Sequence, residues 1–405
     1  MSSRAPRGAS FSLNARPTPL TLLGIWAVIA LAAQRWTSWD EAIRDRFASD
    51  MSSYETIARA APSLPEQHVL RPYAERFPVH WLVGSLADAT GIELHSLYRV
   101  AELALVALAL IVVNQTLSRL RIEPSGHLLA LGVLAASAYP VHYLLAASGM
   151  VSDAVFVLGL SVCLLGFVDG RFALVLAGLT LSVLGRQTGV PVAFAAALWV
   201  AHAPAWRHAR WRHTALVALL PLGTWLALHF GADRFAMAQR GGLHDLSVLG
   251  YLTGPRAFLS HLGRTALPIL VPCALAGGAW LRTRGDVPRG PLLLAAAVVV
   301  QPLLLGPSSA GENEPRLAAL CLPALAVAAG ALLRGARLRG WETAIIGVAV
   351  FAAGLHHRYT HVGLNRPAWL ALEIAGSAVI LAVLARPVVA DFTAARRSAR
   401  RFESG

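Results

Sequence analysis

The sequence contains no lysine, so all 35 of its basic side chains are arginines. Only 14% of the residues are charged, whereas a soluble domain carries about 25%. Hydrophobic residues make up 56% of the chain, and the mean hydropathy is +0.56. This composition excludes a water-soluble protein of ordinary type, and we expect most of the chain to lie in a lipid bilayer.

Cysteine is also scarce, and no C-x-x-C pair occurs. Cys163, Cys273 and Cys321 each fall in an apolar stretch, which predicts small core residues rather than a disulfide framework or a zinc site. P-loop, G-x-S-x-G and H-E-x-x-H patterns are absent, which argues against an ATPase, an α/β hydrolase and a zinc protease. The HHRYTH segment at 356–361 lacks zinc-motif spacing. No cofactor is indicated; a divalent metal stays open, although no motif supports one.

The formal net charge of +13 is the feature that would ordinarily indicate nucleic acid as a partner. Here the arginines cluster in short loops beside apolar spans, as the positive-inside rule describes. We therefore expect membrane lipids among the partners and no nucleic acid.

Apolar segments of helical length follow one another along almost the whole chain. They predict an all-α fold, a polytopic transmembrane helical bundle of about twelve spans. The expected spans are 19–35, 96–118, 127–146, 152–168, 172–186, 188–203, 214–230, 265–281, 291–306, 316–333, 343–356 and 368–385.

Arginine-rich loops alternate with longer loops of mixed charge. The rule that positive loops stay inside predicts that both termini are cytoplasmic, in a membrane we expect to be the bacterial plasma (inner) membrane. The chain then divides into an N-terminal tail (1–18), a transmembrane domain (19–386) and a basic C-terminal tail (387–405). The first outer loop, 36–95, is extracytoplasmic and holds short helices.

Most of that loop is polar, from Trp36 to Pro78, and it is too long to be a simple connection. Its Trp, Tyr, Asp and Arg content argues against disorder. Ser52 and Glu55 form an S-x-x-E capping box, which predicts a helix over 53–61 that stops at Pro62. The stretch 79–88 is amphipathic and too short to span, so we expect it at the membrane interface.

Two aspartates of this loop are candidate catalytic bases. Asp50 stands just ahead of the predicted helix, where Ser52 already supplies the cap, so catalysis and local helix stabilisation are equally good explanations of it. Asp40, in WDEAIRD, has the neighbours Glu41, Arg44 and Asp45, which are typical of a solvated helix face. Asp40 is therefore the weaker candidate.

Four arginines are candidate ligands of a phosphate group, because the planar guanidinium binds its oxygens in pairs. Arg71 and Arg76 lie in HVLRPYAERFP, where headgroup anchoring is the alternative. Arg186, with Gln187 in the GRQTG joint between two short spans, favours a cavity over a protruding turn, because a buried charge is costly at membrane depth. The fourth is Arg316.

The segment GENEPR places Glu314 and Arg316 at the mouth of the tenth span, where a structural Glu–Arg pair is the alternative to a role in binding. A second outer turn, SGMVSD, carries Ser152 and Asp153. At the start of a span, Asp153 is explained equally well as a helix cap.

The order of these features resembles the bacterial, polyprenyl-phosphate-sugar-dependent members of the GT-C superfamily of polytopic membrane glycosyltransferases. The resemblance covers residues 19–330 and consists of layout and short motifs. Its carriers are D-x-x-x-Y-x-x-x-A (Asp50, Tyr54, Ala58), R-P-x-x-x-R-x-P (Arg71, Pro72, Arg76, Pro78), the Ser152–Asp153 turn, the GRQTG joint and the stretch from Glu314 to Pro323.

The resemblance implies an inverting transfer of a sugar from a polyprenyl-phosphate donor to an acceptor, whether lipid, glycan or protein, on the extracytoplasmic side. In such enzymes an acidic residue of the first outer loop acts as the base or helps to bind metal, which by position is Asp50. This chain departs from the pattern because its adjacent acidic pair is Asp40–Glu41, so both aspartates stay open. Implied substrate-binding residues are Tyr54, Arg71, Arg76, Arg186, Gln187, Glu314 and Arg316.

Two other functions account for part of the pattern. A multi-span transporter or lipid flippase would explain the span count and Arg186. It explains the long first loop poorly, and the internal repeats that transporters tend to show are not evident. A non-catalytic subunit of an envelope-assembly complex would use the loop to bind a protein partner.

Overall fold

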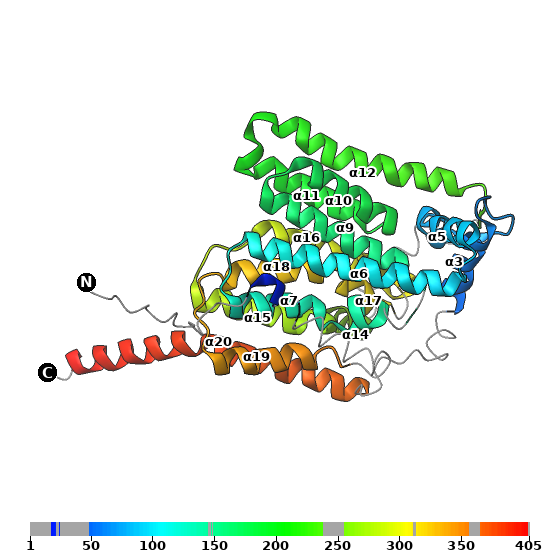
Figure 1. The fold of residues 1–405 in the computed structure, drawn as a ribbon. Helices are drawn as coiled ribbons and strands as arrows, with labels where there is room; N and C mark the ends of the chain where they lie inside the picture. Colours follow the sequence, from blue (N-terminus) through cyan, green and yellow to red (C-terminus); the bar gives the residue numbers. More distant parts are fainter. Residues whose placement is uncertain are drawn as a thin grey trace, which may run out of the picture.

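The computed structural model describes residues 18–21, 24, 48–144, 147, 149–237, 255–310, 313–355 and 365–403. Over these residues the chain is helical, as predicted, apart from a short parallel pairing of Val69–Leu70 (β1) with Ala236–Met237 (β2). The helices form a bundle with α12 along one edge and α19 and α20 along the opposite edge (Figure 1).

Five helical segments of the described chain are long and apolar enough to cross a membrane, which indicates an integral membrane protein. They are Leu94–Arg119 (α6), Val151–Asp169 (α9), Trp206–Ala232 (with α12, Arg210–Ala232), Phe258–Thr283 (with α15, Leu270–Thr283) and Arg366–Val389 (in α20, Arg366–Glu403).

The predicted count of twelve spans is not confirmed. Six of the expected spans are shorter apolar helices, and 19–35 lies largely outside the described residues. A sequence does not distinguish a short buried helix from a span, because both are uniformly apolar. The shorter apolar helices are α7 (Pro124–Ala135), α10 (Phe172–Gly185), α11 (Gly189–His202), the segment Arg289–Leu303 of α16 (Arg289–Ala310), α18 (Leu322–Leu333) and α19 (Gly340–Ala352).

The remaining elements are short and mostly surround one end of the bundle. In Figure 1, α3 and α5 lie together there, near the end of α12. These elements are α3 (Ala48–Ala60), α4 (Arg71–Ala74), α5 (Phe77–Thr90), η1 (Ala138–Tyr143), η2 (Pro204–Ala209), α14 (Pro255–Ala266), η4 (Leu267–Ile269) and α17 (Glu314–Ala319).

The helix α3 begins earlier than the sequence predicts. It starts at Ala48, so Ser52 lies inside it, and the Ser52 carbonyl accepts a hydrogen bond from Thr56 Oγ1 at 2.8 Å. The predicted capping box is therefore wrong, and Asp50 belongs to the first turn of the helix instead of standing ahead of it. The end of α3 at Ala60, just before Pro62, agrees with the prediction.

The stretch predicted over 79–88 is a helix, α5, that runs further at both ends and packs on α3. A Cβ atom on Gly84 would lie 1.9 Å from the Ala58 carbonyl oxygen, so only glycine allows this approach. Trp81 Nε1 donates to the Pro62 carbonyl oxygen at 3.1 Å. The loop is thus built as a packed unit of two helices.

The helices α9 and α10 form an antiparallel pair whose backbones touch through glycines. A Cβ on Gly159 would lie 2.5 Å from Ser182 N, and one on Gly178 would lie 2.4 Å from Cys163 N. Small residues allow such contact inside membranes, where van der Waals packing drives helix association. Because α9 begins beside Asp153 and α10 ends before Arg186, this contact fixes the distance between two charged side chains.

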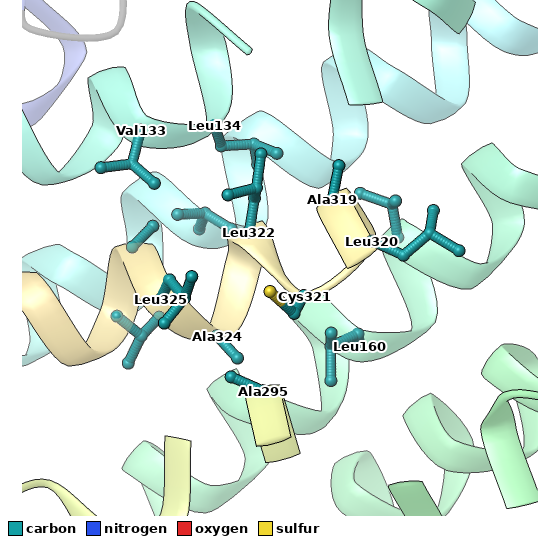
Figure 2. Packing of buried hydrophobic residues seen from close by; sticks show 14 of the residues in the cluster. Val133, Leu134, Leu160, Ala295, Ala319, Leu320, Cys321, Leu322, Ala324 and Leu325 are labelled. Carbon is teal, nitrogen blue, oxygen red and sulfur yellow. The ribbon is translucent and has the colours of Figure 1, made fainter. Parts of the chain in front are cut away.

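The core around Cys321 is packed from small and branched apolar side chains of several helices, as Figure 2 shows. Cys163 and Cys321 are buried, as expected. The prediction is wrong for Cys273, which is exposed on α15, because an apolar position on a lipid-facing helix need not face the core. All three are free thiols.

The glycine contact between α9 and α10 predicts the effect of one added methyl group. Gly178→Ala should lower the free energy of unfolding by about 1–3 kcal/mol, because the new Cβ has no space. Gly223→Ala is the matched control, since nothing lies within 4 Å of its Cβ position in α12. Thermal unfolding in detergent measures both, and equal melting temperatures for the two variants would contradict the close packing.

Candidate functional site

Asp153, in the first turn of α9, is a buried carboxylate held by two buried arginines. Arg316 on α17 donates from Nε to Asp153 Oδ2 at 2.7 Å, and Arg186, just after α10, donates from Nη1 to Oδ1. The three side chains are almost wholly buried. A buried charge is tolerated when it is paired and hydrogen-bonded, so this triad joins α9, α10 and α17.

Asp50 lies next to this triad and shares one of its arginines. Arg316 Nη1 is 3.4 Å from Asp50 Oδ2, while the Tyr73 hydroxyl donates to Asp50 Oδ1. Burial, followed by the nearby Asp50 carboxylate, raises the pKa of Tyr73, so the hydroxyl keeps its proton and acts as a donor. Asp50 is thereby fixed between the loop residue Tyr73 and the bundle residue Arg316.

Arg76 is the third buried arginine, and its contacts are neutral. It donates from Nη1 to Tyr54 Oη at 2.5 Å, and from Nε and Nη2 to Gln187 Oε1 at 3.4 and 3.3 Å. Among the described residues no carboxylate oxygen lies within 4.0 Å of its guanidinium. Tyr54 stacks on the imidazole of His80 with ring centroids 3.8 Å apart.

A second group of polar side chains surrounds Glu75, the residue just after α4. Its Oε2 accepts from Gln187 Nε2 at 2.9 Å and from Trp225 Nε1 at 3.2 Å, and its Oε1 is 2.7 Å from His229 Nδ1. Arg71 Nη1 lies 2.9 Å from His229 Nε2. With Nδ1 donating to Glu75, Nε2 accepts from Arg71.

These groups line one cavity of about 450 Å³. That volume lies in the range of about 300–1,000 Å³ that small-molecule sites occupy. The lining comes from the first loop, from the joint after α10, and from α12, α16 and α17. It consists of Asp50, Arg71, Pro72, Tyr73, Glu75, Arg76, Arg186, Gln187, Thr188, His229, Gln301, Asn313, Arg316 and Leu317.

Most of the residues selected from the sequence meet at this cavity. Tyr54 contacts Arg76 without lining the cavity, and Glu314 binds His261 Nδ1 through Oε1 at 2.9 Å. Asp40 lies outside the described residues. Those that line the cavity are Asp50, Arg71, Arg76, Arg186, Gln187 and Arg316.

Sequence reasoning missed several residues of the site. Asp153 was explicable as a helix cap, although a carboxylate at the start of a long apolar run is itself a signal of a buried partner. Tyr73 and Glu75 belong to the same arginine-containing stretch as Arg71, and their polarity there was the available signal. His229 gave no signal, because it is one of 14 histidines and lies near the end of an ordinary apolar span.

The carboxylates of the site are separated by arginines instead of being grouped together. Asp50 and Asp153 each contact Arg316. In the part of the chain that the structure describes, no three or more His, Cys, Asp or Glu side chains form a cluster able to hold a metal ion. The arginines of the site can bind an anion, and Asp50 can accept a proton.

The buried triad predicts a non-additive pair of substitutions. Asp153→Asn should destabilise the fold by about 3–5 kcal/mol, because it leaves the buried Arg186 without a counter-charge and leaves Arg316 with Asp50 alone. Asp169→Asn, at the other end of α9, is the control; its partner Arg119 is more than half exposed, so the expected effect is below about 1 kcal/mol. Adding Arg186→Gln to Asp153→Asn should recover part of the lost stability. Additive unfolding free energies would contradict the coupling.

The stacked histidine predicts a dependence of stability on pH. Burial, then the nearby Arg76, lowers the pKa of His80 to about 3 from 6.5, so the unfolded chain takes up a proton first as the pH falls. The stability that depends on neutral His80 is present above pH 6.5 and is lost progressively below it. The melting temperature should fall less between pH 6.5 and 5 in His80→Phe than in the wild type. Parallel pH profiles would show that His80 titrates normally.

Comparison with protein-family models, with curated proteins and with solved structures found no match to this chain. The functional conclusions below therefore depend on the residues and their arrangement around the cavity.

Proposed function

We propose that this protein is an integral membrane glycosyltransferase that moves a sugar from a polyprenyl-phosphate donor to an acceptor hydroxyl. The supporting observation is the excess of positive charge at one part of the cavity, which we call the arginine end. There, three guanidinium groups face two carboxylates. The arginine end consists of Arg76, Arg186 and Arg316 with Asp50 and Asp153.

The phosphate of the donor would bind at the arginine end. Arg76 is buried with neutral partners, so a bound anion would supply the counter-charge that the described protein groups do not. Guanidinium groups bind phosphate oxygens in a bidentate manner. Asp153 already neutralises part of the charge of Arg186 and Arg316, which leaves an excess suited to a phosphodiester that becomes more negative as it leaves.

Asp50 is the proposed base. It lines the cavity, whereas Asp153 is enclosed by its two arginines and does not. The Asp50 carboxylate would take the proton of the acceptor hydroxyl as its oxygen bonds to the anomeric carbon, and the bond from that carbon to the phosphate oxygen breaks with inversion. Arg76, Arg186 and Arg316 would stabilise the released polyprenyl phosphate.

The membrane setting belongs to the same proposal. A lipid-linked donor keeps its chain in the bilayer and its phosphate at the surface, which suits a cavity between a polar loop and apolar helices. We propose that the bundle has about twelve spans in a bacterial plasma membrane, with both termini in the cytoplasm and the cavity outside. The acceptor is a lipid, a glycan or a protein.

The same arginine end would also hold the phosphate of a lipid carrier in a transporter or flippase, which would leave the sugar–phosphate bond intact. A non-catalytic subunit of an assembly complex would need neither a buried base nor a cavity. Bond cleavage therefore separates the transferase from the other two functions, and flux of the intact lipid separates those two from each other.

The proposal predicts that Asp50→Asn abolishes turnover while the fold persists. In nanodiscs with a panel of polyprenyl-phosphate sugars and candidate acceptors, release of free polyprenyl phosphate should fall by about 10²–10⁴-fold, as expected for loss of a general base. Asp88→Asn, at an exposed position of α5, is the matched control. Unchanged turnover in Asp50→Asn, or flux of intact donor across liposomes without cleavage, would refute the assignment.

A further inference from the structure

A second part of the cavity, joined to the arginine end through Gln187, has the reverse balance of charge. We call it the carboxylate end and define it by Arg71, Glu75, His229 and Asp233. Here one guanidinium accompanies two carboxylates, and Asp233 forms an ion pair with Arg71. Arg71, Glu75 and His229 line the cavity. An anionic group is disfavoured at this end, so it would bind a different part of a ligand than the arginine end.

Glu75 lines this space and accepts fewer hydrogen bonds than its carboxylate can. A carboxylate offers about four lone-pair sites. Oε2 accepts two hydrogen bonds, from Gln187 and Trp225, and Oε1 accepts one, from His229. The three donors hold the carboxylate rigidly and leave the second site of Oε1 for a donor in the cavity.

Arg71 supplies hydrogen-bond donors beside that acceptor. Its guanidinium has five N–H groups, of which one on Nη1 contacts His229 and one on Nη2 contacts Asp233. The Arg71 and His229 side chains are 24% and 30% exposed, so this end is open to a ligand. His229 therefore bridges the Glu75 carboxylate, an oriented acceptor, and the Arg71 guanidinium, which carries oriented donors.

We propose that the carboxylate end binds neighbouring hydroxyl groups of a sugar ring. A hydroxyl both donates and accepts, and so matches Glu75 Oε1 and Arg71 together. An anion would be repelled by the two carboxylates, and a cation would be opposed by Arg71. This inference rests on the proposed function and adds to it the group that recognises the sugar, apart from the arginines that hold the phosphate. The hydroxyls belong either to the donor or to a saccharide acceptor.

Equilibrium binding tests the proposal without requiring turnover. The full chain in nanodiscs is titrated with a polyprenyl-phosphate hexose, a polyprenyl-phosphate pentose and the same polyprenyl phosphate without a sugar, following intrinsic tryptophan fluorescence. Each titration is repeated with methyl glycosides present. The variants are Glu75→Gln and Arg71→Gln. The matched control is Glu55→Gln on α3, whose carboxylate pairs with Arg59 of the same helix and His95 of α6, outside the cavity.

The wild type and Glu55→Gln should bind a sugar-bearing lipid, or a methyl glycoside, more tightly than each variant does. The expected loss is about tenfold or more, as for a hydrogen bond to a charged group. The sugar-free lipid should bind all four proteins equally. If the variants lose affinity for the lipid donors, the hydroxyls belong to the donor. If they lose affinity only for methyl glycosides, the hydroxyls belong to the acceptor.

Two results would overturn the proposal. One is equal affinity of all four proteins for every sugar-bearing ligand. The other is that Arg71→Gln loses as much affinity for the sugar-free lipid as for the sugar-bearing lipids. That result would make Arg71 a phosphate ligand. Arg71 is partly exposed, so its variant keeps the test decisive if Glu75→Gln does not fold. Sugar-dependent binding without any bond cleavage would refute the transferase while leaving the hydroxyl site in place.

Discussion

The neutralisation of Asp153 by two arginines is the constraint on which the site depends. A single buried carboxylate or guanidinium would be expensive between apolar helices. Together they are tolerated, and they tie the start of α9 to the end of α10 and to the short helix α17. A helix of six residues such as α17 has little stability of its own. Arg316 is therefore placed by its charged partners and by packing, and its position in turn orients Asp50.

The first loop owes its order to the bundle in the same way. Asp50 and Arg76 come from the loop, while Arg316 and Gln187 come from the bundle, and the contacts between them cross the cavity. The β1–β2 pairing fastens the loop to the chain after α12, where Val69 N donates to the Phe235 carbonyl oxygen at 2.9 Å. A loop this polar would not bury its charged side chains without partners already fixed by the helices.

The sequence predicted the helical class and much of the site, because both depend on local signals. Apolar runs identify helices, and a charge inside such a run, as at Arg186, requires a buried partner. The sequence did not predict contacts between segments that lie far apart along the chain. Asp153 looked like a cap because its two partners lie 33 and 163 residues away. Ser52 was predicted to be a cap because its spacing to Glu55 fits the motif. In the structure, α3 packs against α5 and starts about one turn before Ser52. The number of spans is not confirmed for a related reason, since hydropathy does not report whether a short helix reaches the lipid.

Gln187 shows why an amide stands between the two ends of the cavity. Its Oε1 accepts from Arg76, and its Nε2 donates to Glu75 and to the Pro72 carbonyl oxygen at 3.0 Å. A carboxylate there would repel Glu75, and a cation would repel Arg76. An aliphatic side chain would leave both charged groups with one partner fewer. Only a neutral group that donates from one atom and accepts at another satisfies both sides, so Gln187 keeps a cationic and an anionic region apart within one cavity. In the function we propose, that separation would let a single ligand present a phosphate to one region and hydroxyl groups to the other.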